Sequence, residues 1–406
     1  MREHLSVFIL MLLRTGIQGI NFLLLVYLLP TTDVGWIATF TSLAITLSTF
    51  TSLGANYVIM QEVIVFKSDL TSVSTLFFSA QVYLSSAAIF IILILLRVGD
   101  LDNHLIAIAA LVFIYEGLFS KAIELQSIIN QVAGKTVKSQ YLLLNMAAAR
   151  LFLTTLMYST GYRDALSYCF GFAVLLFVYF IYVINSSNPK IAFLSPQETL
   201  RAAKRLKVSR ITVFNQSISN GVLVFVGDGI KPVITFFAGP SATAGLAISQ
   251  KLIEVALLPA KTLLFNRLRS WFESKGDINA IVKSLGLKNA VFSLGIGITS
   301  YFFGLFIVDM LYQSKYPGFA HFWWPLAFVI PLKGVALAVG DYLVSTGFPL
   351  RRTLGLLCSP IVASLIFGTN MSLDLATVIL ASESAAFIVL LFFAIAASRQ
   401  SAPSSK

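Results

Sequence analysis

A lysine and a glutamate one helical turn apart stand inside a long apolar stretch of this chain. Lys251 and Glu254 belong to the run Ile248-Ser-Gln-Lys-Leu-Ile-Glu-Val-Ala-Leu-Leu-Pro259, within the apolar stretch 242–265. A cation near the centre of a hydrocarbon core about 30 Å thick is costly unless it is paired or lines a wet cavity. Lys251 is therefore a candidate for binding an anionic group, and Glu254 is its candidate partner.

Polar side chains interrupt several other apolar stretches of the chain. Arg14, Gln18 and Asn21 are spaced i, i+4 and i+7, and this spacing puts them on one helical stripe. Asp228 and Lys231 share a face if their stretch is one continuous helix. We predict an anion-binding set of Lys251, Arg14 and Lys333. The predicted polar lining or coupling residues are Glu254, Asp228, Lys231, Gln18, Asn21 and Asp341.

Each of these residues also has a structural interpretation that needs no ligand. Arg14 reaches the membrane interface if the first span begins later than its apolar run suggests. Asp228 and Lys231, three residues apart, neutralise each other near the outer boundary. Glu254, in the structural interpretation, serves only as the ion-pair partner of Lys251. The sequence leaves these alternatives open.

Composition identifies the class of protein to which these residues belong. The 406 residues are 57% hydrophobic and 12% charged, with a mean hydropathy of +0.85, whereas soluble domains have about 25% charged residues. Apolar runs of membrane length recur from end to end, which predicts an all-α polytopic membrane protein with about twelve transmembrane helices. The predicted spans are 5–29, 34–60, 72–96, 103–125, 139–160, 165–184, 209–238, 242–265, 285–311, 322–344, 353–368 and 373–397.

Loop charges predict the orientation of these spans. Even-numbered loops are rich in lysine and arginine, whereas odd-numbered loops hold little beyond Arg97, Arg163 and Lys315. Basic residues prefer the cytoplasm, so both termini are expected there. The same bias, together with attraction to anionic membrane lipids, accounts for the net charge of +11 without any nucleic acid. The two cysteines lie in apolar segments, and no residue pattern predicts a metal or cofactor.

The longest connection divides the chain into two halves. Residues 185–208 form a basic linker with a predicted amphipathic helix on the cytoplasmic surface. It separates an N-terminal six-helix lobe, 1–184, from a C-terminal six-helix lobe, 209–406. Short matches recur at corresponding positions of the halves: Pro30 to Gly35 against Pro240 to Gly245, and Gly134 against Gly347. These matches predict two pseudo-symmetric lobes around a central cavity that holds the substrate site.

The same segments resemble a known family of transporters. The run Leu28-Leu-Pro-Thr-Thr-Asp-Val-Gly-Trp36, the run Ser52-Leu-Gly-Ala-Asn-Tyr57 and the Lys251 to Pro259 segment are similar to patterns of polysaccharide or O-antigen flippases. These flippases belong to the multidrug/oligosaccharidyl-lipid/polysaccharide exporter superfamily. The resemblance implies alternating-access export of a polyprenyl-diphosphate-linked oligosaccharide, such as a lipopolysaccharide O-antigen unit, across the bacterial inner membrane. It also implies that Arg14 and Lys251 bind the diphosphate.

The resemblance carries expectations about partners and leaves alternatives. It implies a monomer that handles a polyprenyl-diphosphate-linked glycan and works beside a polysaccharide polymerase and other assembly proteins. A cation-coupled drug or metabolite antiporter of the same superfamily is the alternative, and a dominant acidic cavity favours it. A membrane polysaccharide polymerase needs a long external loop, and every predicted external loop is short. With no nucleophile triad or nucleotide motif, we expect a transporter and no enzyme.

Overall fold

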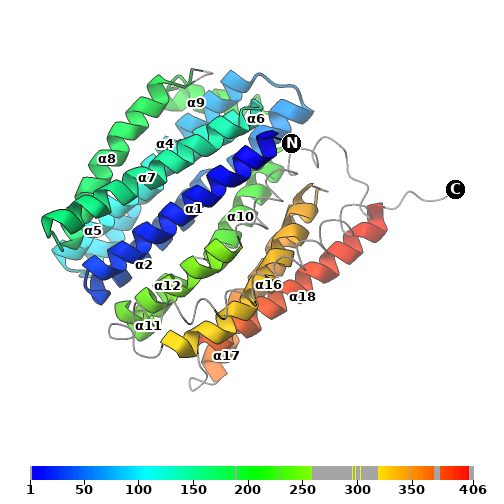
Figure 1. Cartoon of the computed structure of the whole chain (residues 1–406). Coiled ribbons are helices and arrows are strands. Elements are labelled where there is room, and N and C mark those ends of the chain that lie inside the picture. Colours follow the sequence, from blue (N-terminus) through cyan, green and yellow to red (C-terminus); the bar gives the residue numbers. More distant parts are fainter. Residues whose placement is uncertain are drawn as a thin grey trace. The chain divides into compact units, whose positions relative to one another are not determined.

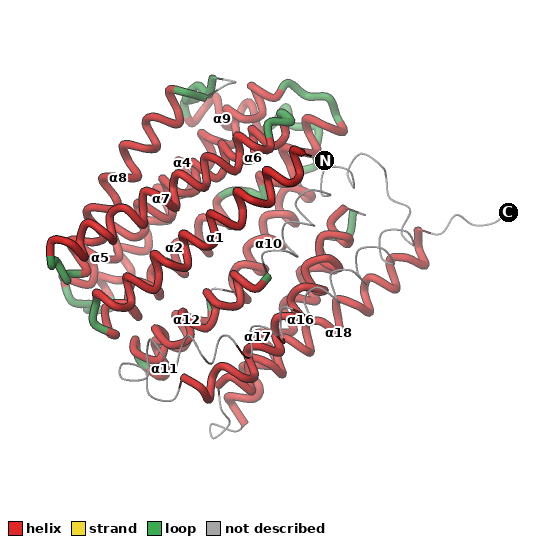
Figure 2. Tube along the Cα trace, viewed as in Figure 1, coloured by secondary structure: helices red, strands yellow, loops and turns green. Residues whose placement is uncertain are grey.

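Every regular element in the described part of the chain is a helix (Figure 1). The structure is a computed structural model that describes residues 2–187, 190–227, 229–257, 319–345, 347–369 and 375–401, together with Gly295, Ile298 and Phe302. Figure 2 shows long helices joined by short loops. The chain divides into two compact units, Met1–Ala247 and Ile248–Lys406. The predicted lobe boundary at 185–208 stays a prediction.

The first unit contains eleven α-helices and two π-helices among its described residues and begins a twelfth α-helix. They are α1 (Arg2–Leu28), α2 (Thr31–Thr51), α3 (Ala55–Met60), η1 (Gln61–Val65), α4 (Leu70–Val98), α5 (Asn103–Val112), η2 (Phe113–Ser120), α6 (Lys121–Val132), α7 (Thr136–Thr160), α8 (Ala165–Asn185), α9 (Pro196–Ala203), α10 (Arg210–Gly227), α11 (Ile230–Ala238) and α12 (Pro240–Ala256). Figure 1 shows α1 lying along α7, and the two helices are in extensive contact. Helix α2 packs against α10, α11 and η2 and is largely buried.

The second unit begins within α12 and contains three further long helices in its described part. These are α16 (Phe319–Ser345), α17 (Pro349–Thr369) and α18 (Leu375–Ser401). Helix α18 packs along both α16 and α17, so it forms the centre of this group. The predicted span 285–311 lies outside the described residues, apart from Gly295, Ile298 and Phe302.

Seven helical stretches in the described part are long and apolar enough to cross a membrane. Six of them correspond to the first six spans predicted from the sequence, with ends that differ by a few residues. The predicted span 209–238 consists of two helices, because α10 ends at Gly227 and α11 begins at Ile230. Pro232 lies in the first turn of α11, where a proline costs no intrahelical hydrogen bond.

Two of the membrane-length stretches are not uniform α-helices. The second bends after α2, where Leu53 and Gly54 adopt φ angles of 53° and 65°. It then ends in η1, and the fourth stretch contains η2 between α5 and α6. Short π-helical turns inside α-helices occur frequently at functional sites. Each of these two carries an acidic residue, Glu62 in η1 and Glu116 in η2.

Helix ends in the first unit follow capping rules that the sequence displays. Asp69 accepts a hydrogen bond from the backbone N–H of Ser72 at the start of α4, and Asp164 does the same for Ser167 at the start of α8. Ser195 and Glu198 form a reciprocal capping box at the start of α9. Gly161 ends α7 with a φ of 74°, a conformation that glycine adopts at little cost.

Candidate functional site

Lys251 and Glu254 form an ion pair on α12. The Lys251 Nζ atom lies 2.7 Å from Glu254 Oε2, and the two residues are one helical turn apart. Their side chains are 37% and 38% exposed, so water screens part of their attraction. An exposed pair of this kind can exchange partners at small cost. A role in binding substrate stays a prediction for both residues.

Lys333 faces a carboxylate that sequence reasoning did not single out. Its Nζ atom lies 3.1 Å from Oε1 of Glu383, which α18 brings against α16. The side chains are 26% and 11% exposed, so this pair is more buried than Lys251 and Glu254. The available signal was a carboxylate deep within the predicted span 373–397, because an ionisable residue inside a span is a candidate functional site.

Asp341, the other predicted polar residue on α16, lies near an arginine of α17. The Arg352 Nη2 atom is 3.6 Å from Asp341 Oδ1, and their side chains are 3% and 15% exposed. The guanidinium passes over Gly340, where a Cβ atom would lie 3.1 Å from Arg352 Nε. Arg352 belongs to the predicted basic loop between the spans 322–344 and 353–368. The structure instead buries it, because α17 begins at Pro349 and includes it in the first turn.

The three residues of the polar stripe on α1 differ in burial. Asn21 is buried, and its Oδ1 atom accepts a hydrogen bond of 2.6 Å from the Thr154 hydroxyl of α7. Arg14 and Gln18 are only partly buried. The packing of α1 on α7 buries Asn21 more than it buries Arg14 and Gln18. That the three side chains line one cavity stays a prediction.

Lys231 lies buried at the start of α11, next to a cluster of threonines. Its backbone carbonyl accepts from the Thr235 hydroxyl at 3.0 Å. The Thr235 hydroxyl lies 2.5 Å from that of Thr39 on α2 and 2.7 Å from that of Thr243 on α12. These hydroxyls join three helices. The predicted partner of Lys231, Asp228, lies outside the described residues.

A buried ion pair of the first unit joins η2 to α7. Arg150 Nη2 lies 2.5 Å from Glu116 Oε1, with side chains 24% and 8% exposed. The Arg150 guanidinium stacks over the Phe172 ring at 4.4 Å, and Phe172 meets Tyr115 edge to face. Glu116 and Arg150 fall within the predicted spans 103–125 and 139–160, and no sequence pattern connects them. Their 34-residue separation gives no periodic signal of contact.

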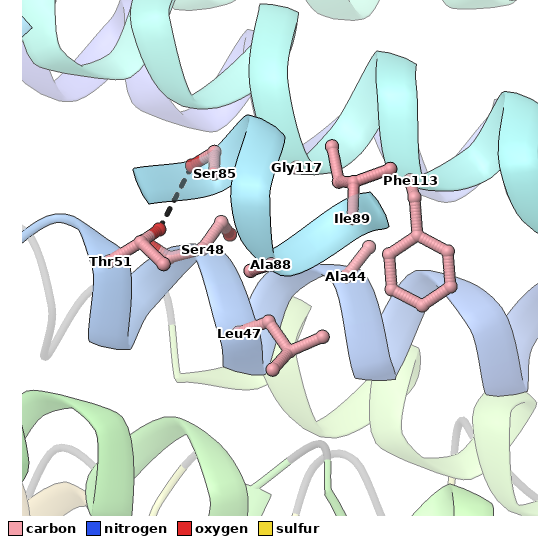
Figure 3. Close-up of a pocket in the computed structure, with 9 residues that line it drawn as sticks. All are labelled: Ala44, Leu47, Ser48, Thr51, Ser85, Ala88, Ile89, Phe113 and Gly117. Carbon is pink, nitrogen blue, oxygen red and sulfur yellow. Dashed lines mark hydrogen bonds between the residues drawn. The ribbon is translucent and has the colours of Figure 1, made fainter. Parts of the chain in front are cut away.

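The serine- and threonine-rich helix α2 lines a small pocket with α4 and η2. Its free space, part of which is open to solvent, is about 190 Å³, and Figure 3 shows its lining. Thr51 and Ser85 hydroxyls lie 2.9 Å apart there, and Ser48 donates to the carbonyl of Ile45. A drug-sized ligand needs roughly 300 Å³ or more. We therefore assign these hydroxyls to helix packing.

Four cations of the described helices lie in ion pairs with carboxylates. Lys251, Lys333, Arg150 and Arg352 each face one carboxylate, so the four pairs are neutral together. Within the part of the chain that the structure describes, no three His, Cys, Asp or Glu residues are placed to hold a metal ion.

Solved structures of transporters share this fold. An outward-facing multidrug resistance MATE transporter of the MOP superfamily matches with a TM-score of 0.72 and 13% identity over 98% of this chain and 96% of that one. A MOP superfamily transporter from Pyrococcus furiosus, described as having a binding pocket of reverse polarity, matches with a TM-score of 0.70 and 12% identity over 98% and 95%. The fold is that of MOP superfamily transporters.

The MATE multidrug transporter DinF-BH, solved with a bound ligand, matches similarly, with a TM-score of 0.69 and 12% identity over 97% of this chain and 94% of that one. No family model and no curated protein matches the chain. These likenesses confirm the predicted all-α polytopic fold. At this low identity they show the fold alone, and they do not show the flippase family that the sequence resembles.

Proposed function

We propose that this chain is a secondary transporter that works by alternating access and exchanges a drug or metabolite for a cation. The observation that carries the proposal is the pairing of intramembrane cations with carboxylates, above all Lys333 with Glu383. The fold shared with multidrug transporters over almost the whole chain supports it. This proposal favours the antiporter over the flippase that the sequence resemblance implies.

Charge balance is the physical reason for this preference. A diphosphate site needs cations whose charge is available to the ligand. Lys251 and Lys333 each have their charge offset by a carboxylate 2.7 Å and 3.1 Å away. A cationic substrate or a coupling ion competes with the lysine for the same carboxylate. Exchange of one cation for another at Glu383 or Glu254 is therefore the simplest chemistry that these pairs offer.

Flipping of a polyprenyl-diphosphate-linked glycan is the second candidate. Lys251 and Glu254 favour it, because both side chains are more than a third exposed and a diphosphate can displace the glutamate. Under this proposal Lys251, Arg14 and Lys333 keep their predicted role as anion ligands, and a polysaccharide polymerase is an expected partner.

Transport by the purified full chain in proteoliposomes distinguishes these functions. We expect uptake of the fluorescent cation ethidium driven by a proton or sodium gradient. This uptake should fall at least ten-fold in Glu383→Gln and change little in Glu124→Gln, a control from a partly exposed ion pair within one helix. A gradient-independent signal, or equal loss in both variants, contradicts antiport. Complementation of a flippase-null strain by wild type, but not by Lys251→Ala, would establish the second candidate instead.

A further inference from the structure

The linker between α8 and α10 is fixed to the first unit at two places. Leu194 donates its N–H to Ser79 Oγ at 3.0 Å and accepts from the Tyr83 hydroxyl at 2.9 Å. Farther along, Lys207 Nζ donates to the Phe66 carbonyl at 2.7 Å, and the Val208 N–H donates to Glu62 Oε1 at 2.7 Å. These bonds hold the linker in a defined position.

The burial pattern along α4 indicates the depth of the linker relative to the hydrocarbon core. Residues 73–79 in its first half are all buried, while Phe90, Ile91, Leu95 and Val98 in its second half are exposed apolar side chains. The 29 residues of α4 span about 43 Å, longer than a hydrocarbon core of about 30 Å. The helix is therefore long enough for turns at one end to extend beyond the core. Leu194 forms its hydrogen bonds with Ser79 and Tyr83, which lie at the boundary between the buried residues of the first half of α4 and the exposed apolar residues of its second half.

Aromatic packing reinforces that position. Phe193 contacts Tyr83 and Phe78 edge to face, with ring centroids 5.4 Å and 6.3 Å away. Phe193 remains 56% exposed on its other side. Aromatic rings of this kind are enriched where a membrane meets water. We therefore expect the linker to lie at the membrane interface, on the side that loop charges predict to be cytoplasmic.

The helix of the linker presents cations and an apolar residue on its outer face. Thr199 is buried against the protein, whereas Leu200 is 67% exposed. Leu200, Arg201 and Lys204 lie on the face opposite Thr199, at helical spacings of three and four residues. Residues 190–210 contain five cations besides Arg210, and one carboxylate. That carboxylate, Glu198, is engaged in the capping box of α9.

We propose that this outer face is a docking surface for anionic phospholipid headgroups. We define it as the basic linker face, formed by Lys190, Leu200, Arg201, Lys204, Arg205 and Lys207. The cations complement headgroup phosphates, and Leu200 enters the acyl boundary beside them, as in interfacial amphipathic helices. An acidic protein partner would use the charges without needing an exposed leucine at membrane level. The proposal does not depend on which substrate is transported.

Lipid retention measured by native mass spectrometry tests the proposal. The full chain is purified in detergent with equal amounts of phosphatidylglycerol and phosphatidylcholine. We expect retained phosphatidylglycerol to fall about ten-fold in Arg201→Gln/Lys204→Gln, since each surface cation contributes a several-fold preference. The matched control, Lys135→Gln/Lys138→Gln, removes two cations from the basic turn at the start of α7 and should retain the lipid.

Further measurements separate the remaining outcomes. Both variants change surface residues, so their melting temperatures in phosphatidylcholine alone should equal that of the wild type. Leu200→Ser should also lower retention without changing any charge. Equal retention of the two lipids, or an equal loss in both double variants, overturns the proposal. Displacement of phosphatidylglycerol by millimolar inorganic phosphate would overturn it too, because the face would then bind free phosphate.

Discussion

Lys333 illustrates what a single charge requires inside an apolar helix. Alone it would be costly, and opposite Glu383 it becomes part of a neutral unit whose two members come from different helices. Removing one member of such a pair destabilises the fold more than replacing both members with apolar residues, because the remaining charge stays buried. The same reasoning applies to Glu116 and Arg150, and there it can be tested without a substrate.

We predict that Arg150→Ala lowers the free energy of unfolding by about 3 kcal/mol, because it leaves Glu116 buried and unpaired and also removes the stacking on Phe172. Thermal or denaturant unfolding in detergent measures this loss. Lys121→Ala is the control, since its partner Glu124 is 36% exposed and such pairs contribute at most about 1 kcal/mol. Equal losses in the two variants would contradict a structural role for the buried pair.

Helix caps make part of the stability of the first unit dependent on pH. The pKa of Asp164 is lowered, chiefly by the backbone N–H of Ser167 and also by the Ser167 hydroxyl. A carboxyl with a depressed pKa stabilises the folded state above its unfolded pKa of about 3.9, and this contribution is lost as pH falls through the folded value.

We therefore predict that wild type melts above Asp164→Asn at pH 7 and that the difference disappears below about pH 4. Melting temperatures across this range measure it. Asp102→Asn is the control, because Asp102 precedes α5 without accepting a capping hydrogen bond. A difference that stays constant with pH would show that the charge of Asp164 does not stabilise α8.

Helix α2 meets the start of α12 through a glycine that has no room for a side chain. A Cβ atom at Gly35 would overlap the carbonyl oxygen of Pro240. We predict that Gly35→Ala forces the two helices apart and costs about 1 to 3 kcal/mol of stability, the usual cost of overpacking. Thermal unfolding of the variant beside the wild type provides the measurement.

Gly245 is the matched control for Gly35, since a Cβ atom there meets nothing within 4 Å. Gly245→Ala should be neutral or should stabilise by up to about 1 kcal/mol, because alanine favours the helix. A destabilised Gly245→Ala beside an unaffected Gly35→Ala would refute the close approach.

At the scale of the whole chain, the lengths of the apolar runs predicted where the first six membrane-length helices lie. They did not predict which helices contact one another. The runs beginning near Leu5 and ending near Asn185 fixed six spans because each had to cross a membrane. Periodicity carries no information about which helices meet, so the contacts of Glu383 with Lys333 and of Glu116 with Arg150 were missed. The π-helices η1 and η2 were missed as well, because they keep the apolar character of their neighbours.

The proposed duplication gains support from two turns that were matched in the sequence. Gly134 and Gly347 adopt φ angles of 78° and 90°. Gly134 N–H donates to Gln131 and the next N–H to Asn130; Gly347 N–H donates to Val344 and the next N–H to Leu343. Both turns are therefore Schellman motifs with the same spacing, and each precedes a further helix by two residues. The recurrence agrees with duplication of a six-span unit, which stays a prediction.

Orientation across the membrane can be decided at the two ends of one helix. The 25 residues of α7 span about 37 Å, enough to cross the hydrocarbon core. Lys135 precedes α7 in a basic turn, and Tyr162, 63% exposed, follows it in the turn before α8. Basic residues prefer the cytoplasm, so Lys135 should face it and Tyr162 should face outward.

We predict that, in a Cys169→Ala/Cys358→Ala background, an impermeant maleimide labels Tyr162→Cys in intact spheroplasts and labels Lys135→Cys only after the membrane is opened. Labelling of both sites in lysed membranes is the control for reactivity. The reverse pattern would invert every loop and would place the basic linker face outside the cell. The basic linker face would then not reach the anionic cytoplasmic leaflet. The labelling therefore also tests the cytoplasmic location that the lipid-docking proposal requires.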